Sequence, residues 1–160
     1  MLKQIALFVG LLIASHTVLG QDREKLFGVW KLVSFETELQ TTGERRPVFG
    51  KNPNGYLIFT PQGRMMALLT NESRKAAATD QERAELLRTM ISYSGIYHLE
   101  ADKFVTKVDI SWNEAWTGTE QVRFYKLQGD RLDIISAWAP SVTIPGTPMV
   151  RGIFTWERQK

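Results

Sequence analysis

Few residues of this chain could carry acid–base, nucleophilic or metal chemistry. The sequence has no cysteine and two histidines, of which only His98 lies outside an apolar N-terminal segment. A serine–histidine–aspartate triad would depend on that one histidine, and neither a thiolate nor a multi-histidine metal site can form. His98 follows Tyr97 on an expected strand, so an inward Tyr97 leaves His98 in solvent. We therefore expect no catalytic residues, no metal and no cofactor.

Ser34 and Glu36 are polar side chains whose spacing suggests an interior site. They follow Trp30 at even spacing on an expected strand, so an inward Trp30 turns both of them inward as well. A buried carboxylate is costly unless it is paired, and two later strands offer partners. A short connection centred on Trp116 can place Asp109 of one strand opposite Arg123 of the next.

Two interpretations of those later strands compete. In the first, their polar faces look inward, and a ligand carboxylate or carbonyl meets Arg123 or Lys107. In the second, the alternate apolar residues look inward and the charged ladder is solvated surface. A one-residue change in register would convert one interpretation into the other, because it turns every side chain of a strand to the opposite face. The polar set is Lys107, Asp109, Ser111, Gln121, Arg123 and Tyr125, and the apolar set is Val108, Ile110, Val122 and Phe124.

Eight strand-like segments, mostly joined by tight turns, must position these side chains. Hairpin spacing of this kind predicts an all-β fold, an eight-stranded antiparallel up-and-down barrel, although a two-sheet sandwich would show similar spacing. A barrel of eight strands encloses side chains or one small ligand. The expected strands are residues 26–38, 55–60, 64–69, 95–100, 104–111, 120–127, 131–137 and 150–157.

One helix is expected between the third and fourth of these strands. Thr79 and Glu82 have the spacing of a capping box. Leu86, Leu87, Met90 and Ile91 then recur at helical spacing, and we expect this stripe to close one end of the barrel. Residues 41–54 are expected to form a loop, and residues 138–149 a long irregular connection of the kind used as a lid or binding loop.

The first twenty residues are typical of a signal peptide. Lys3 precedes an uncharged run over residues 5–14, which is short for a membrane span, although an uncleaved anchor is the alternative. We expect residues 21–160 to form the domain, exported to the periplasm or secreted, with no membrane span after cleavage. The formal charge of +3 comes without a run of like charges, so no nucleic-acid partner is expected.

A set of motifs covers most of the mature chain in order and carries a family resemblance. Gly28-Val29-Trp30 opens the first strand, and Leu32-Val33-Ser34-Phe35-Glu36 follows. Further motifs are residues 55–65, 94–97 and 116–119, then Gln121, Arg123 and Tyr125, then residues 129–132 and 156–158. The set resembles bacterial and fungal lipocalin-like domains. The resemblance implies a calycin-like, ligand-binding barrel whose floor is plugged by Trp30.

The chain also departs from that family pattern. Related domains often carry two histidines and a glutamate on the fifth strand, where this chain has Thr106-Lys107-Val108-Asp109. The resemblance therefore does not imply histidine-dependent chemistry for this chain. The helix also differs from the usual lipocalin layout, in which it follows the eighth strand.

The tryptophans are expected at both ends of the barrel. Trp30 and Trp156 are placed near the floor, where Arg158 could stack on an indole face. Trp112, Trp116 and Trp138 flank loops, where they either line a mouth for an apolar ligand or cover the barrel end.

Three functions are compatible with these residues. The first is binding of a small, largely apolar or amphipathic molecule inside the barrel. The second is a small isomerase- or cyclase-type enzyme that uses barrel carboxylates such as Glu36 and Asp109. The third is a filled barrel that binds a protein partner through its loop tryptophans. The ligand-binding residues predicted for the first function are Ser34, Glu36, Tyr97, Lys107, Asp109, Arg123, Tyr125 and Trp138.

Overall fold

The computed structural model describes residues 23–141, 144 and 146–160, so the predicted signal peptide lies outside the described residues. The strands are β1 (Gly28–Leu39), β2 (Arg45–Pro47), β3 (Asn54–Phe59), β4 (Arg64–Thr70), β5 (Met90–Glu100), β6 (Lys103–Ser111), β7 (Glu120–Gln128), β8 (Arg131–Ser136), β9 (Ala139–Pro140) and β10 (Met149–Arg158). Residues 23–26 are helical, and the other helical segments of the described residues are α2 (Asp80–Arg88) and the 3₁₀ turn η1 (Glu114–Trp116).

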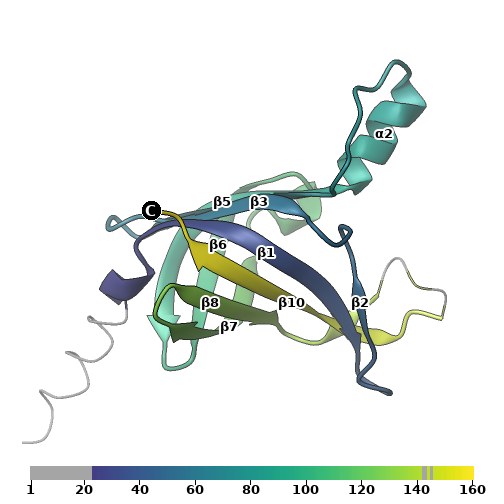
Figure 1. The fold of residues 1–160 in the computed structure, drawn as a ribbon. Coiled ribbons are helices and arrows are strands. Elements are labelled where there is room, and N and C mark those ends of the chain that lie inside the picture. The colour runs from purple at the N-terminus through teal and green to yellow at the C-terminus, as the bar shows by residue number, and fades with distance from the viewer. Residues whose placement is uncertain (1–22, 142–143, 145) are drawn as a thin grey trace, which may run out of the picture.

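The strands close into a barrel (Figure 1). Antiparallel pairing runs from β1 through β3 and each following strand to β8, then to β10, and β10 pairs back with β1. Among the described residues, eight strands form this closed antiparallel barrel. The short strands β2 and β9 pair with the ends of β1 and β10. The barrel expectation is confirmed. Closure satisfies the sheet edges that a sandwich would leave unpaired.

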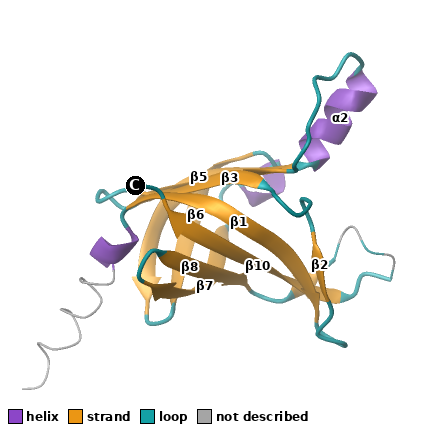
Figure 2. Cartoon of the chain, in the orientation of Figure 1, coloured by secondary structure: helices purple, strands orange, loops and turns teal. Residues whose placement is uncertain are grey.

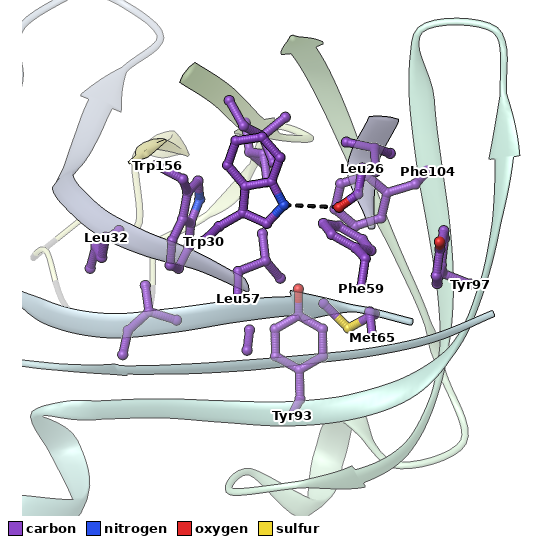
Figure 3. Packing of buried hydrophobic residues seen from close by; sticks show 14 of the residues in the cluster. Leu26, Trp30, Leu32, Leu57, Phe59, Met65, Tyr93, Tyr97, Phe104 and Trp156 are labelled. Carbon is purple, nitrogen blue, oxygen red and sulfur yellow. Dashed lines mark hydrogen bonds between the residues drawn. The ribbon is translucent and has the colours of Figure 1, made fainter. Parts of the chain in front are cut away.

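Trp30 plugs the floor of the barrel. Its side chain is fully buried, and its indole Nε1 donates to the Leu26 carbonyl oxygen at 2.9 Å (Figure 3). The Arg158 guanidinium carbon lies 4.1 Å from the centre of the indole. Leu32 and Trp156, paired across β1 and β10, are also buried. The inward direction of Trp30 and Leu32 and the stacking of Arg158 are as expected.

A β-bulge in β1 overturns the expected direction of Ser34 and Glu36. The pairing with β10 shifts between Leu32 and Ser34, and the alternation of faces shifts with it. Phe35 therefore turns into the core and stacks on Phe154, with ring centres 4.3 Å apart. Ser34 and Glu36 lie on either side of Phe35 along the strand and point to the opposite face. The inward prediction for these two residues is wrong because even spacing holds only in a strand without a bulge.

The helix α2 does not close the barrel. None of its residues is buried, and it projects away from the barrel wall (Figures 1 and 2). Its capping box between Thr79 and Glu82 is present as predicted. Met90 and Ile91 belong to β5, which leaves Leu86 and Leu87 as an incomplete stripe. The short β2 lies within the expected loop, and the helix follows β4, so its placement between strands three and four is not confirmed.

Candidate functional site

The barrel interior holds a cavity of about 40 Å³ beneath Trp116 of η1. One water molecule needs roughly 10–15 Å³ of such space, so the cavity suits a compact molecule better than a long acyl chain. Aliphatic side chains from β3, β4, β5 and β8 form part of its wall. The other lining residues are the aromatic Tyr93, Phe104, Trp116, Phe154 and Trp156, and one charged residue, Arg123.

Arg123 brings a cation into this apolar cavity. The residue is 9% exposed. Its Nη1 donates to the Val122 carbonyl oxygen at 2.8 Å and its Nη2 to Gln121 Oε1 at 3.2 Å. The guanidinium carbon lies 5.9 Å from the centre of the Tyr93 ring and 5.7 Å from that of Trp116. Two aromatic faces and two neutral oxygens thus hold the charge.

The register between β6 and β7 separates Arg123 from Asp109. Arg123 lies opposite Phe104, and the ladder ends where Lys107 meets Glu120. The connection between β6 and β7 contains the η1 turn, which keeps its residues out of the ladder. Asp109 therefore lies beyond the last pair of this ladder. Asp109 instead forms an ion pair with Arg64 at 2.7 Å on the solvent side. The predicted Asp109–Arg123 pair is therefore wrong.

Neither interpretation of the β6 and β7 faces holds throughout. Arg123 on β7 faces inward, as in the interpretation with inward polar faces. Val108 on β6 is buried, as in the interpretation with inward apolar residues. The pairing of β5 with β6 shifts between Ser94 and Gly95, which leaves Asp109 as the extra residue. Beyond it Ile110 turns outward and is 70% exposed. The bulge explains why one strand changes its inward parity part-way along its length.

Lys107 is directed away from the cavity. It is exposed and donates from Nζ to the Gly118 carbonyl oxygen at 2.6 Å. The first interpretation named Lys107 or Arg123 as the group that meets a ligand, and of these two only Arg123 lines the cavity.

Tyr97 is buried in the floor, outside the cavity lining. Its ring packs edge-on against Phe59, with centres 5.0 Å apart (Figure 3). Burial raises the pKa of the Tyr97 phenol, and the nearby Arg23 guanidinium opposes this. His98, the neighbour of Tyr97, is exposed as predicted and contacts Glu100 at 3.0 Å.

The remaining predicted residues also lie outside the cavity lining. Tyr125 is half-buried, with its ring centre 6.2 Å from that of Phe104. Trp138 packs under Arg151, whose guanidinium carbon is 4.5 Å from the indole centre. Of the eight residues predicted to bind a ligand, the structure places only Arg123 in the cavity wall.

Sequence reasoning missed most of the aromatic lining. Tyr93 and Tyr97 are four residues apart on β5, so both point inward. This spacing is a signal for Tyr93. The sequence pattern, however, places residues 90 and 91 in the helix and starts the strand at residue 95, so Tyr93 falls outside the expected strand. Trp116 and Trp156 were expected at opposite ends of the barrel, yet both line this cavity.

Comparison with known proteins places the chain in a family. A family model described as a lipocalin-like domain matches residues 27–159. The chain belongs to the lipocalin-like domain family. Its match begins just before the Gly-x-Trp motif of β1 and ends after β10, so this lipocalin-like domain includes the whole barrel.

A solved structure of an uncharacterized protein from Bacteroides eggerthii DSM 20697 is similar, with 15% sequence identity and a TM-score of 0.44 over 84% of this chain and 99% of that chain. No curated protein gives a significant match.

The lipocalin-like domain shows neither a membrane-spanning helix nor a metal-binding cluster among its described residues. Within the described residues, no helix has the length and apolar character needed to cross a bilayer. In the same part of the chain, no group of three or more histidine, aspartate or glutamate side chains is arranged to hold a metal ion.

Proposed function

We propose that this lipocalin-like domain binds a small, largely apolar molecule in the cavity inside its barrel. The observation that carries the proposal is the cavity beneath Trp116, whose wall is aromatic and aliphatic apart from Arg123. Ligand sites in proteins combine such apolar walls with a few well-placed polar groups. The volume of about 40 Å³ favours a compact ligand.

The two alternative functions receive less support. The isomerase or cyclase hypothesis relied on Glu36 and Asp109, and neither carboxylate belongs to the cavity lining. General acid–base chemistry in the cavity would need a titratable group within reach of the substrate. The filled-barrel hypothesis relied on a surface of three tryptophans. Trp112 and Trp116 do contact each other, with ring centres 4.9 Å apart, but Trp138 packs on Arg151.

Export is part of the proposal. It rests on Lys3 and the uncharged run over residues 5–14, which have the pattern of a signal peptide. The ligand would then be met in the periplasm or outside the cell.

Native mass spectrometry of the exported protein, purified without detergent, and xenon-129 NMR of the same protein under xenon test the binding function. We expect a stoichiometric adduct, either a copurified molecule or a saturable xenon complex, because xenon suits a cavity of about 40 Å³. Ala67, which is 3% exposed and lines the cavity, provides the variant: Ala67→Leu should fill the space and abolish the adduct. Ala84→Leu on the exposed helix is the control, because it adds the same atoms far from the cavity. A wild-type protein that binds nothing, or an adduct unaffected by Ala67→Leu, would contradict the proposal.

A further inference from the structure

Arg123 differs from the other arginines of the barrel strands in its partners. Arg64, Arg131, Arg151 and Arg158 each pair with a carboxylate within 4 Å. Their side chains are between 26% and 58% exposed. Arg123 is the buried one of these five arginines, at 9% exposure of the residue, and forms no ion pair with a described residue. Among these five, the buried arginine is thus the one without a carboxylate partner in the described part of the chain.

The groups around Arg123 leave part of its hydrogen-bonding capacity unused. A guanidinium has five N–H donors, and the contacts to Val122 and Gln121 use one from each terminal nitrogen. Removing a cation from water is costly unless a counter-charge is supplied. Neither of these neutral oxygens supplies one, and the lining of the cavity contains no carboxylate.

A second donor in the same wall is also unpaired. Trp156 is 2% exposed, and its indole Nε1 has no hydrogen-bond partner among the described residues. Indole and guanidinium nitrogens donate and do not accept. The unpaired indole donor therefore calls for an acceptor on the ligand, and the positive charge of Arg123, which has only neutral partners, favours an anion.

We infer that the cavity is built for a compact monoanion, a small carboxylic acid whose carboxylate binds Arg123 while its apolar body packs against Tyr93 and Trp116. This inference rests on the proposed function and names its ligand class. One cation accommodates one negative charge, and a guanidinium matches the two oxygens of a carboxylate. The edge-to-face contact of Tyr93 with Trp116, at 5.4 Å between ring centres, provides the apolar wall.

Three small probes separate this inference from the proposed function: acetate, acetamide and xenon. Each has few heavy atoms, as a cavity of about 40 Å³ requires. Binding of acetate and acetamide to the mature wild-type protein is measured by titration calorimetry at pH 7, and binding of xenon by xenon-129 NMR. We expect acetate to bind at least tenfold more tightly than acetamide, which has the same shape without the charge. Acetate affinity should also fall with the ionised fraction as the pH passes below the pKa of acetic acid, while acetamide affinity stays constant.

Variants then assign the charge to its residue. Arg123→Met keeps the length of the side chain, and we expect it to lower acetate affinity at least tenfold and to leave xenon affinity equal or higher. Trp156→Phe removes the indole N–H and should lower acetate affinity about threefold to tenfold. Arg83→Met, on the exposed face of α2, is the matched control and should change neither affinity.

The outcomes are distinct. Xenon binding with equal affinities for acetate and acetamide, or acetate binding that survives Arg123→Met, would overturn the anion inference and leave the proposed function standing. No binding of any of the three probes would defeat both. If Arg123→Met fails to fold, the pH dependence of the wild-type protein still decides between an anionic and a neutral ligand.

Discussion

Arg158 and Trp30 form a stacked pair across the seam that closes the barrel. The two residues lie opposite each other in the β1–β10 ladder, 4.1 Å from guanidinium carbon to ring centre. Arg158 Nη1 also donates to the Phe27 carbonyl oxygen at 2.8 Å. The pair therefore joins the last strand to the first strand and to the segment that precedes it.

Replacing Arg158 should destabilise the barrel. Arg158→Gln removes the cation–π contact and the hydrogen bond to Phe27, so we expect the free energy of unfolding to fall by about 2 kcal/mol. Urea denaturation at neutral pH measures this. Arg83→Gln, which breaks an exposed helical ion pair, should cost no more than about 0.5 kcal/mol. Equal effects of the two substitutions would show that the stacked pair adds nothing beyond a surface contact.

Gly95 should tolerate no side chain. A Cβ atom at this position would lie 2.0 Å from the Lys107 carbonyl oxygen, which the β5–β6 bulge brings close. We expect Gly95→Ala to lower the free energy of unfolding by about 3 kcal/mol or more, because backbone must move. Gly129→Ala is the comparison, since Gly129 has φ +60° and open space around it. It should cost only about 1 kcal/mol, and a Gly95→Ala cost no greater than this would argue against the close approach.

Glu38 should contribute to stability in a pH-dependent way. It is 7% exposed, with Arg45 at 2.8 Å and Arg151 at 2.7 Å from its two oxygens. Burial alone would raise the pKa of Glu38, but the hydrogen bonds and charges of the two arginines outweigh it and hold the pKa below its ordinary 4.5. A lowered folded-state pKa stabilises the fold above the unfolded pKa, and this contribution is lost as the pH falls through the folded value.

The variant Glu38→Gln isolates that contribution. We expect the difference in unfolding free energy between wild type and Glu38→Gln to stay constant from pH 7 to about 5 and to shrink below 4.5. Urea denaturation across this range measures it. Other carboxyl groups with lowered pKa values, such as Asp133, titrate in both proteins and cancel in the difference. A difference that grows on acidification would reverse the assigned sign.

The helix α2 should contribute little to barrel stability. Leu87 is 50% exposed, so Leu87→Ser should change the free energy of unfolding by less than about 0.5 kcal/mol. Leu69→Ala, at a residue 2% exposed in the core, should cost about 2–5 kcal/mol. Thermal denaturation of both variants makes the comparison. A large loss in Leu87→Ser would mean that the helix packs on the barrel in solution.

Several features were accessible from the sequence because they depend on local chemistry. The capping box of Thr79 and Glu82 formed as its spacing predicts, and the turn over residues 61–63 joins β3 to β4. Hairpin spacing favoured the barrel that the structure shows, and the family resemblance carried by the Gly-x-Trp motif implied the buried Trp30, on which Arg158 stacks. The start of β5 was missed because Met90 and Ile91 fit a helical stripe as well as a strand.

The candidate site depended on features that alternation does not contain. The bulge between Leu32 and Ser34 puts Phe35, not Glu36, into the core. The bulge opposite Gly95 turns Ile110 toward solvent. One extra residue in a ladder reverses every side chain beyond it. A bulge depends on how two distant strands pair, so periodicity along one strand gives no sign of it.

Turn residues and apolar alternation act over a few positions, so the all-β class, the hairpin order and the residues available for chemistry could be predicted from the chain alone. The position of Arg123 in the cavity wall, with Asp109 paired to Arg64 outside it, became known only from the folded barrel. Register is the cause, because strand pairing selects which polar side chain is buried with aromatic neighbours and which one reaches water.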